Sequence, residues 1–294
     1  MNFYIVDVFA EDKYTGNPLA VVFGEGVTAL SDAEMQQIAQ EMNYSETTFV
    51  PSAQTQDGGY DVRIFTPRKE LPFAGHPTLG TAYIIQQELI QAPVDRIFLN
   101  LGVGQIPVTW TEDEDGDEVL WMQQNSPEFY QTLEIGAIAS SLSLDPVEID
   151  GRFPIQEVST GVPFIIVPLK SLAALKRAKI SFAAYEKLIE TTNTKEILLF
   201  SPEPYSPENN LSARMFAPSL GIPEDPATGS ANGCLAGYLV QHQYFGSERV
   251  EIQVEQGYEI NRPSILSLQA ERNGDKITVK VGGKVVMVAK GELL

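Results

Sequence analysis

The chain has 294 residues, a length that favours two domains of ordinary size over one large core. It is 43% hydrophobic and 20% charged, which is the composition of a globular protein and excludes disordered and low-complexity classes. Its formal net charge of -19 disfavours binding to nucleic acid or to an anionic membrane surface, because both are themselves negatively charged.

Cysteine and histidine are too few for a structural zinc site. The sequence holds one cysteine, Cys234, and two histidines, His76 and His242, so an intramolecular disulfide is also excluded. The first residues show neither a basic region nor a small-residue cleavage site, and no apolar run approaches the roughly 18 residues of a membrane span. We therefore expect a cytoplasmic protein.

Short β-rich runs dominate the sequence, and turn signals separate many of them. In chain order, strands are expected at residues 3–9, 19–23, 47–50, 60–65, 97–101, 106–110, 119–122, 164–168, 197–201, 211–216, 250–255, 264–270, 277–281 and 285–289. Between the last two, Gly282-Gly283 is expected to form a two-residue hairpin loop with positive φ at both glycines.

Amphipathic helices are fewer than strands. Ser31 and Glu34 form a capping box, in which Ser31 caps the first helical turn and Glu34 reaches back to it. The spacing of one apolar helix face follows, at Met35, Ile38, Ala39 and Met42. A second helix is expected at residues 181–189. Because strands and helices do not alternate strictly, the expected fold class is α+β rather than a doubly wound sheet.

Two segments contain no charged residue at all. They are residues 71–87 and 226–247, and each includes a helix-like stretch, at 77–87 and 231–241, that is apolar or small on every side. A helix without a polar face is buried all round. In a β-rich protein, we expect each of these helices to be enclosed by a curled sheet.

The two uncharged segments also resemble each other. The run Arg63–Pro67 parallels Arg214–Pro218, and Pro72–His76 parallels Pro226–Ser230, in the same order along the chain. This predicts a duplication, with two similar halves that each hold one central helix. The connection is expected near residues 125–128, so that the halves comprise residues 1–127 and 128–278.

Each enclosed helix begins with a glycine and a polar residue, Gly75-His76 and Gly229-Ser230. Unpaired N–H groups and the positive end of the helix dipole make such a start suitable for an anion. Ordinary capped helix ends explain the same residues equally well. The dipole favours the neutral form of His76, which can then accept or relay a proton, but a satisfied buried histidine is the simpler interpretation.

Two carboxylates stand near these features. Glu46 is surrounded in sequence by Ser, Thr and Phe, with no basic residue nearby. If it is buried, its pKa should rise, and it can then exchange a proton near neutral pH, but the favoured interpretation from the sequence alone is a surface glutamate at a strand start. Asp225 precedes Gly229 by four residues and either caps the loop or takes part in catalysis. Thr228 and Ser230 are expected to be caps or ligand donors.

Taken together, several motifs resemble the phenazine-biosynthesis isomerase family, the PhzF-like proteins, over essentially the whole chain. The matching segments are Gly16–Val22, Ser45–Phe49, Phe65–Pro67, Phe73–Gly80 and Asp225–Ala231, with Gly282-Gly283 and Gly291–Leu293 near the end. The combination is specific, whereas each piece alone would be weak.

The resemblance implies a diaminopimelate-epimerase-like fold, with two pseudo-symmetric barrel-and-helix halves and the active site between them. It further implies that residues 279–294 return to complete the first half. Members of the family are commonly homodimers and use no cofactor or metal. By position, Glu46 matches the proton-transferring glutamate, while His76 and Asp225 match residues that assist protonation. Substrate-binding positions match Ser45, Gly75, Gly229 and Ser230.

The resulting hypothesis is a cofactor-independent isomerase that moves a proton and a double bond on a small unsaturated carboxylate. One alternative is an amino-acid or hydroxy-acid epimerase with Glu46 and His76 as opposed bases. Another is a binding protein without catalytic activity on the same scaffold. Racemisation by two thiols is disfavoured, because the helix starts carry His76 and Ser230 where related racemases carry cysteines, and Cys234 lies one turn further in.

Overall fold

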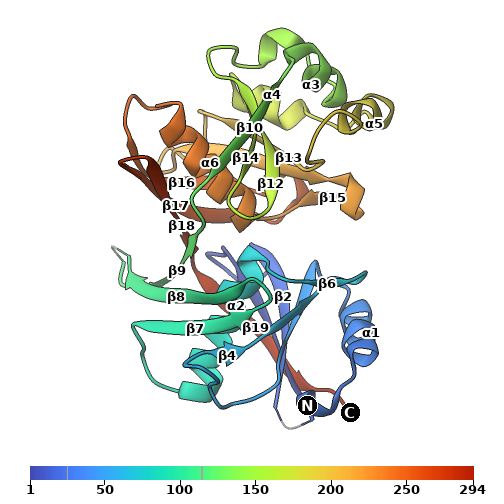
Figure 1. Cartoon of the computed structure of the whole chain (residues 1–294), viewed down its shortest axis with the longest axis vertical. Coiled ribbons are helices and arrows are strands. Elements are labelled where there is room, and N and C mark those ends of the chain that lie inside the picture. The colour runs from blue at the N-terminus through green and yellow to red at the C-terminus, as the bar shows by residue number, and fades with distance from the viewer. Residues whose placement is uncertain (25, 114) are drawn as a thin grey trace. The chain divides into compact units, whose positions relative to one another are not determined.

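The computed structural model describes residues 1–24, 26–113 and 115–294. Its internal contacts divide the chain into two compact units. The first unit comprises Met1–Gln123 together with Gly282–Leu294, and the second comprises Gln124–Val281. Figure 1 shows both units, and each is described here by itself.

The first unit is built from two groups of strands around a central helix. One sheet has the order β19-β1-β2-β3-β5-β6, and a second group has the order β9-β8-β7-β4 (Figure 1). The strands are β1 (Asn2–Val8), β2 (Asn17–Phe23), β3 (Glu46–Val50), β4 (Tyr60–Asp61), β5 (Arg63–Phe65), β6 (Glu70–Leu71), β7 (Arg96–Leu101), β8 (Gly104–Glu112), β9 (Glu118–Gln124) and β19 (Val285–Glu292). The helical segments are η1 (Val27–Ala29), α1 (Asp32–Met42), α2 (Gly75–Ile84) and the π-helical turn η2 (Ile85–Ile90).

Helix α2 is enclosed between these two groups of strands, as its uncharged sequence predicts. It contacts β1, β2, β3 and β19 of the first sheet and β7 and β8 of the second group. Every residue of α2 except Tyr83 is buried. Gly80 allows the closest approach, because a Cβ atom there would lie 2.6 Å from Leu19 Cδ2 and 2.9 Å from Val8 Cγ2.

The capping box predicted at Ser31 and Glu34 is confirmed at the start of helix α1. The Ser31 hydroxyl accepts a hydrogen bond from the backbone N–H of Glu34 at 3.3 Å, and the Glu34 carboxylate accepts one from the Ser31 N–H at 2.8 Å. The helix ends at Asn43, whose φ of 55° lies in the left-handed region. This turn directs the chain back into β3, so that Glu46 becomes the first residue of that strand.

The second unit repeats the plan with a larger sheet. Its strands follow the order β10-β11-β12-β13-β14-β16-β17-β18, and β15 pairs with β14. They are β10 (Glu128–Leu133), β11 (Ile155–Ser159), β12 (Pro163–Pro168), β13 (Ile197–Ser201), β14 (Leu211–Ala217), β15 (Ile222–Asp225), β16 (Arg249–Gln256), β17 (Ser264–Asn273) and β18 (Lys276–Gly283). The helical segments are α3 (Ile135–Ser141), η3 (Pro146–Glu148), α4 (Leu172–Arg177), α5 (Phe182–Ile189), η4 (Pro218–Leu220), α6 (Gly229–Gln241) and η5 (Tyr258–Ile260).

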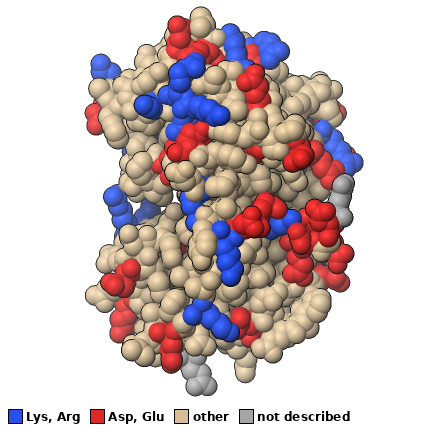
Figure 2. All heavy atoms as spheres, turned by 180° about the vertical axis from the view of Figure 1, so that it is seen from behind, with Lys and Arg blue, Asp and Glu red and all other residues tan. Residues whose placement is uncertain are grey.

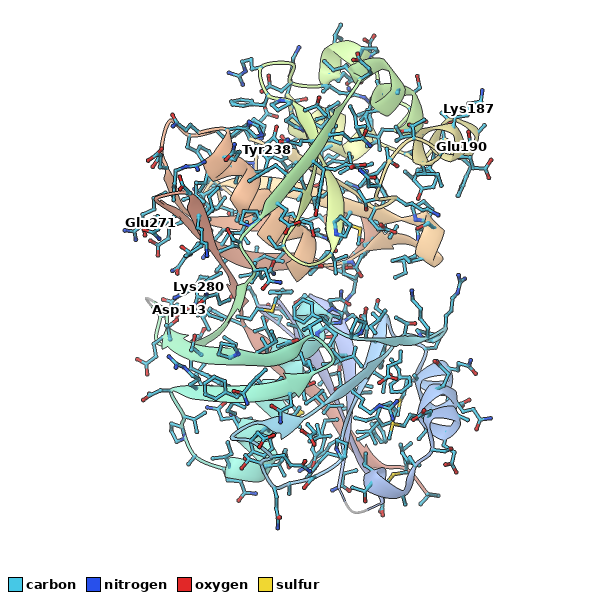
Figure 3. The ribbon with its side chains drawn as sticks, in the orientation of Figure 1. Asp113, Lys187, Glu190, Tyr238, Glu271 and Lys280 are labelled. Atoms are coloured by element: carbon cyan, nitrogen blue, oxygen red, sulfur yellow. The ribbon has the colours of Figure 1, made fainter. Side chains whose placement is uncertain are left out.

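Helix α6 is the central helix of the second unit. It contacts β11, β12, β16 and β17, and each of its residues from 231 to 240 is buried. Tyr238, labelled in Figure 3, lies on this helix, and its hydroxyl donates a hydrogen bond to the carbonyl of Pro154 at 2.7 Å. The helix expected at residues 181–189 is confirmed as α5, where Lys187 is exposed and Tyr185 and Leu188 are buried. Lys187 and the C-cap residue Glu190 are labelled in Figure 3.

The internal repeat extends to an ion pair that the sequence comparison did not include. Arg63 on β5 binds Glu70 on β6 through two hydrogen bonds of 2.7 Å. Arg214 on β14 binds Glu224 on β15 in the same two-pronged manner, at 2.9 and 2.7 Å. Each glutamate lies five residues before the glycine that begins the central helix. In both units, therefore, the same arginine–glutamate ion pair binds the short strand that precedes the central helix.

The expected hairpin at Gly282-Gly283 is wrong. Both glycines lie within β18, and neither has a positive φ. Gly282 is needed for close packing instead, since a Cβ atom there would lie 2.5 Å from the ring of Trp121. The following strand, β19, pairs with β1 in the other sheet of the first unit. Gly282 therefore marks a close contact, and neither glycine forms a turn.

Charged side chains of both signs lie interspersed on the face drawn in Figure 2. One cluster joins Lys284 to Glu11, Asp113 and Asp117 at 2.8–3.0 Å. None of the helices in the described part of the chain combines the length and hydropathy that a bilayer-spanning helix requires.

Replacing Gly80 by Ala should destabilise the first unit, because the added methyl group must displace Leu19 and Val8. Overpacking of this kind costs about 1–3 kcal/mol. Gly136→Ala on α3 is the matched control, since nothing lies within 4 Å of a Cβ atom there and alanine is the better helix former. Urea unfolding of both variants measures the difference, and equal stabilities would contradict the tight packing of α2.

Candidate active site

Glu46 is the first residue of β3 and lies beside the parallel strand β2. Strands β2 and β3 are parallel, and Leu19 pairs with Glu46 in their register. The Glu46 side chain is 13% exposed, so most of it is removed from water. The expectation of a surface glutamate is therefore not met, and the carboxylate points inward from the strand.

His76 is the second residue of α2 and faces Glu46. Its Nε2 atom lies 3.4 Å from Glu46 Oε2, and its side chain is 6% exposed. The ring also makes a hydrogen bond with the backbone of Pro18. Since proline has no N–H, the carbonyl of Pro18 must accept this bond from a ring nitrogen. Nε2 has no hydrogen-bond partner among the described residues, so the donor is Nδ1.

The protonation state of His76 follows from these contacts. Burial lowers the pKa of His76 to about 3, against which the Pro18 bond acts only in part. The imidazole is therefore neutral at physiological pH, with its proton on Nδ1 and a lone pair on Nε2. That lone pair can accept a hydrogen bond from Glu46 only when the Glu46 carboxyl group carries a proton.

A second contact holds β3 and α2 in register. The hydroxyls of Thr48 and Thr81 lie 2.8 Å apart and are buried. Thr48 follows Glu46 by two strand residues, or about 6.7 Å. Thr81 follows His76 by five helical residues, or about 7.5 Å. The Thr48–Thr81 bond therefore joins β3 to α2 at a second point beside the Glu46–His76 contact.

The start of α2 has no side-chain cap. Its N-cap residue is Ala74, which lacks a polar side chain, and Thr78 bonds back to the Ala74 carbonyl at 2.7 Å. Gly75 provides the first helical N–H group. Ser45, which precedes Glu46, is half-buried.

Asp225 belongs to the second unit, where it ends β15 and lies close to the start of α6. It is 6% exposed, and its Oδ2 accepts a hydrogen bond of 2.6 Å from the Thr228 hydroxyl. Thr228 is the N-cap residue of α6 but makes no capping bond with its side chain. Its hydroxyl orients Asp225 instead, so the expected capping role of Thr228 is not observed.

Two glutamines that sequence reasoning missed hold this segment. Gln124 donates from its side-chain amide to the carbonyl of Gly229 at 3.0 Å, and Gln256 bonds to the loop between Asp225 and Thr228. Neither glutamine stands in a motif, and their partners lie 105 and about 30 residues away in sequence. Ser230, one residue after Gly229, is half-buried.

The structure therefore brings the candidate residues together in two groups. Glu46 and His76 form one group at the start of α2, with Ser45 and Gly75 adjacent to them in the chain. Asp225, Gly229 and Ser230 form the other at the start of α6.

Cys234 has the environment of a core residue. Its thiol is fully buried, lies 3.6 Å from the Thr160 hydroxyl, and has a pKa that burial raises to about 12. A thiol with such a pKa is not a nucleophile or base at neutral pH. Within the described residues, no three His, Cys, Asp or Glu side chains are arranged to hold a metal ion.

Comparison with known proteins identifies close relatives along the full chain. A trans-2,3-dihydro-3-hydroxyanthranilate isomerase of Pseudomonas aeruginosa is 36% identical and covers 98% of this chain and 98% of its own. An uncharacterized isomerase of Clostridium acetobutylicum is 32% identical and covers 100% and 98%. The crystal structure of a phenazine biosynthesis protein of the PhzF family from Bacillus anthracis matches with a TM-score of 0.91 at 28% identity, covering 100% and 99%.

A more distant structure supports the fold alone. A probable proline racemase of Agrobacterium radiobacter has a TM-score of 0.64 at 8% identity, covering 100% of this chain and 92% of its own. The diaminopimelate-epimerase-like fold expected from the sequence is thus confirmed, and the curated relatives establish that the chain is an isomerase. It belongs to the phenazine biosynthesis-like family, or PhzF-like family, whose model matches residues 6–291.

Acidification should destabilise the protein through His76. An unfolded histidine has a pKa near 6.5, whereas burial lowers that of folded His76 to about 3. Between these values the unfolded state binds more protons, so the free energy of unfolding falls as the pH falls. One histidine contributes at most about 1.4 kcal/mol per pH unit.

Urea unfolding between about pH 7 and pH 4 measures this slope in the wild type and in His76→Gln. The variant should lose less stability on acidification than the wild type. His242→Gln is the matched control, because His242 is only half-buried and should change the slope less. Equal slopes for the wild type and His76→Gln would contradict a buried neutral His76.

Proposed function

We propose that the protein is a cofactor-independent isomerase that moves a proton, and with it a double bond, on a small unsaturated carboxylate. Glu46 is the general acid and base. The observation that carries the proposal is the contact of Glu46 Oε2 with Nε2 of His76, a ring held in its neutral form and in a single tautomer by burial and by the Pro18 carbonyl.

The chemistry begins at the Glu46 carboxylate. It removes a proton from a carbon next to the conjugated system, so that the C–H bond breaks and its electron pair enters that system. The proton now on Glu46 can be shared with Nε2 of His76, which stabilises the state in which Glu46 holds it. Glu46 then returns the proton to the far end of the conjugated system, where a new C–H bond forms and the double bond has shifted.

The helix starts supply the anion-binding groups in this proposal. The uncapped N–H groups at Gly75 and Gly229 and the Ser230 hydroxyl bind the substrate carboxylate and the charge that develops during transfer. Asp225, oriented by Thr228, assists the second proton transfer.

The epimerase alternative needs two bases on opposite sides of one carbon. Glu46 Oε2 and His76 Nε2 are 3.4 Å apart, which leaves no space for a carbon atom between them. This distance favours a single acid–base unit over two opposed bases, and therefore favours isomerisation.

Replacement of Glu46 by Gln should lower turnover by about 10²–10⁴-fold, because the amide cannot accept the proton. The first probe is trans-2,3-dihydro-3-hydroxyanthranilate, the compound in the name of the Pseudomonas relative, followed by a panel of small cyclic unsaturated carboxylates. Deuterium uptake from deuterated water and ultraviolet detection of the shifted double bond measure the reaction.

Glu41→Gln is the matched control, since Glu41 lies exposed at the end of α1. It should keep full activity, and both variants should melt close to the wild-type temperature. Full turnover by Glu46→Gln would remove the proposed base, and an inverted centre without a shifted double bond would identify an epimerase.

A further inference from the structure

Gln256 is the last residue of β16 and one of the most buried polar side chains of the second unit, at 1% exposure. Its side-chain amide bonds to both ends of the loop that carries Asp225. Nε2 donates to the Asp225 carbonyl at 2.9 Å and to the Thr228 hydroxyl at 3.2 Å. Oε1 accepts from the Thr228 N–H at 3.4 Å and from Asn232 Nδ2 at 2.8 Å. All four hydrogen bonds of a primary amide are thereby made.

The orientation of this amide follows from its backbone partners. The Thr228 N–H can only donate, so the atom of Gln256 that faces it must be oxygen. The Asp225 carbonyl can only accept, so the atom that faces it must be the nitrogen. Asn232 agrees with this assignment, because its Nδ2 also donates to the Thr228 carbonyl at 3.1 Å.

The amide in turn determines where the Thr228 hydroxyl places its hydrogen. Because Gln256 Nε2 donates to Thr228 Oγ1, the hydroxyl hydrogen must point elsewhere, and Asp225 Oδ2 lies 2.6 Å away. The chain of bonds therefore runs from the Gln256 amide through the Thr228 hydroxyl to the Asp225 carboxylate. It orients one carboxylate oxygen with a hydrogen bond of fixed direction.

The end of β16 lies in close contact with the loop between Asp225 and Thr228. Gly257 has a φ of 79°, and a Cβ atom there would lie 2.6 Å from the carbonyl oxygen of Pro226. The neighbouring Glu255 is itself held by the backbone N–H of Ser206 at 2.9 Å and by Asn209 Nδ2 at 2.7 Å. Gln256 is therefore the last residue of a strand whose end is in close contact with the loop that carries Asp225.

We propose that Gln256 is a positioning residue that acts through Thr228 to orient the carboxylate of Asp225 for proton transfer. This inference rests on the proposed function, in which Asp225 assists catalysis. It predicts that Gln256 affects turnover through the direction of the Thr228 hydroxyl hydrogen, in addition to any effect on stability.

Gln256→Glu is the informative variant, because it keeps the size of the side chain and the oxygen that faces Thr228 N–H. When the new carboxyl group is neutral, its O–H can still donate to the Asp225 carbonyl. When it is ionised, it has no donor and attracts the Thr228 hydroxyl hydrogen away from Asp225. We expect kcat to fall by about tenfold to hundredfold as the pH rises and this group ionises, with recovery on acidification.

The titratable neighbours of this position are few. Among the described side chains bonded to Gln256 or Thr228, Asp225 is the group that titrates. The strand residues paired with Gln256 are Ala213 on β14 and Ser264 on β17, and the partner on α6 is Asn232. A pH dependence that appears only in the variant is therefore that of the introduced carboxyl group.

Gln253→Glu on the same strand is the matched control, since the Gln253 side chain is exposed, and its pH profile should equal that of the wild type. Thr228→Val removes the hydroxyl and keeps the shape of the side chain. If Gln256 acts through that hydroxyl, Gln256→Glu should change kcat little in the Thr228→Val background, and the double-mutant cycle should be strongly non-additive.

The activity measurements use the carboxylate that takes up deuterium in the screen above. If Asp225→Asn abolishes turnover but Gln256→Glu keeps the wild-type kcat and pH profile, the positioning role is overturned and the proposed function stands. If Asp225→Asn is fully active, the role assigned to Asp225 fails, and this inference fails with it. Additive effects in the cycle would overturn the route through Thr228.

Proton NMR gives a readout that needs no substrate and no variant. In the wild type, the Thr228 hydroxyl proton and both side-chain amide protons of Gln256 should exchange slowly with water and show mutual nuclear Overhauser contacts. Rapid exchange of the Thr228 hydroxyl proton would contradict the hydrogen-bond chain.

Discussion

One contact underlies the arrangement of the first unit: the neutral His76 presents the lone pair of Nε2 to Glu46 Oε2 at 3.4 Å. Three features of the first unit maintain it. The Pro18 carbonyl holds the other ring nitrogen, the absence of a side chain at Gly80 lets α2 lie against β1 and β2, and the Thr48–Thr81 bond keeps β3 and α2 in register. Burial of the pair then ensures that the imidazole stays uncharged, because a charge there would lose its hydration.

The two units share a scaffold but differ in the side chains at the start of the central helix. Both units clamp an arginine to a glutamate five residues before the central helix, and both begin that helix with glycine. The next residue differs. It is His76 in one unit, opposite a glutamate, and Ser230 in the other, where the nearby carboxylate is Asp225 held by Thr228. One scaffold therefore places a carboxylate beside a neutral imidazole in the first unit and an oriented carboxylate in the second.

Much of this arrangement could be predicted from local sequence. The central helices were recognisable because an uncharged helix has to be buried, and α1 because a capping box is a short-range signal. The roles of Gln124 and Gln256 could not be predicted, since a glutamine on a strand has no local signature and its partners lie far away in sequence. Gly282-Gly283 was misassigned because a glycine pair serves equally for a turn or for close packing, and only the position of Trp121 distinguishes the two.

The position of the His76 proton tests this arrangement most directly. Nitrogen-15 NMR of the wild-type protein labelled at histidine reports which ring nitrogen carries it. We expect a protonated Nδ1 and an unprotonated Nε2, unchanged between about pH 8 and pH 5. A proton on Nε2, or a titration of His76 near its ordinary pKa, would contradict this arrangement, because Glu46 would then face a donor in place of an acceptor.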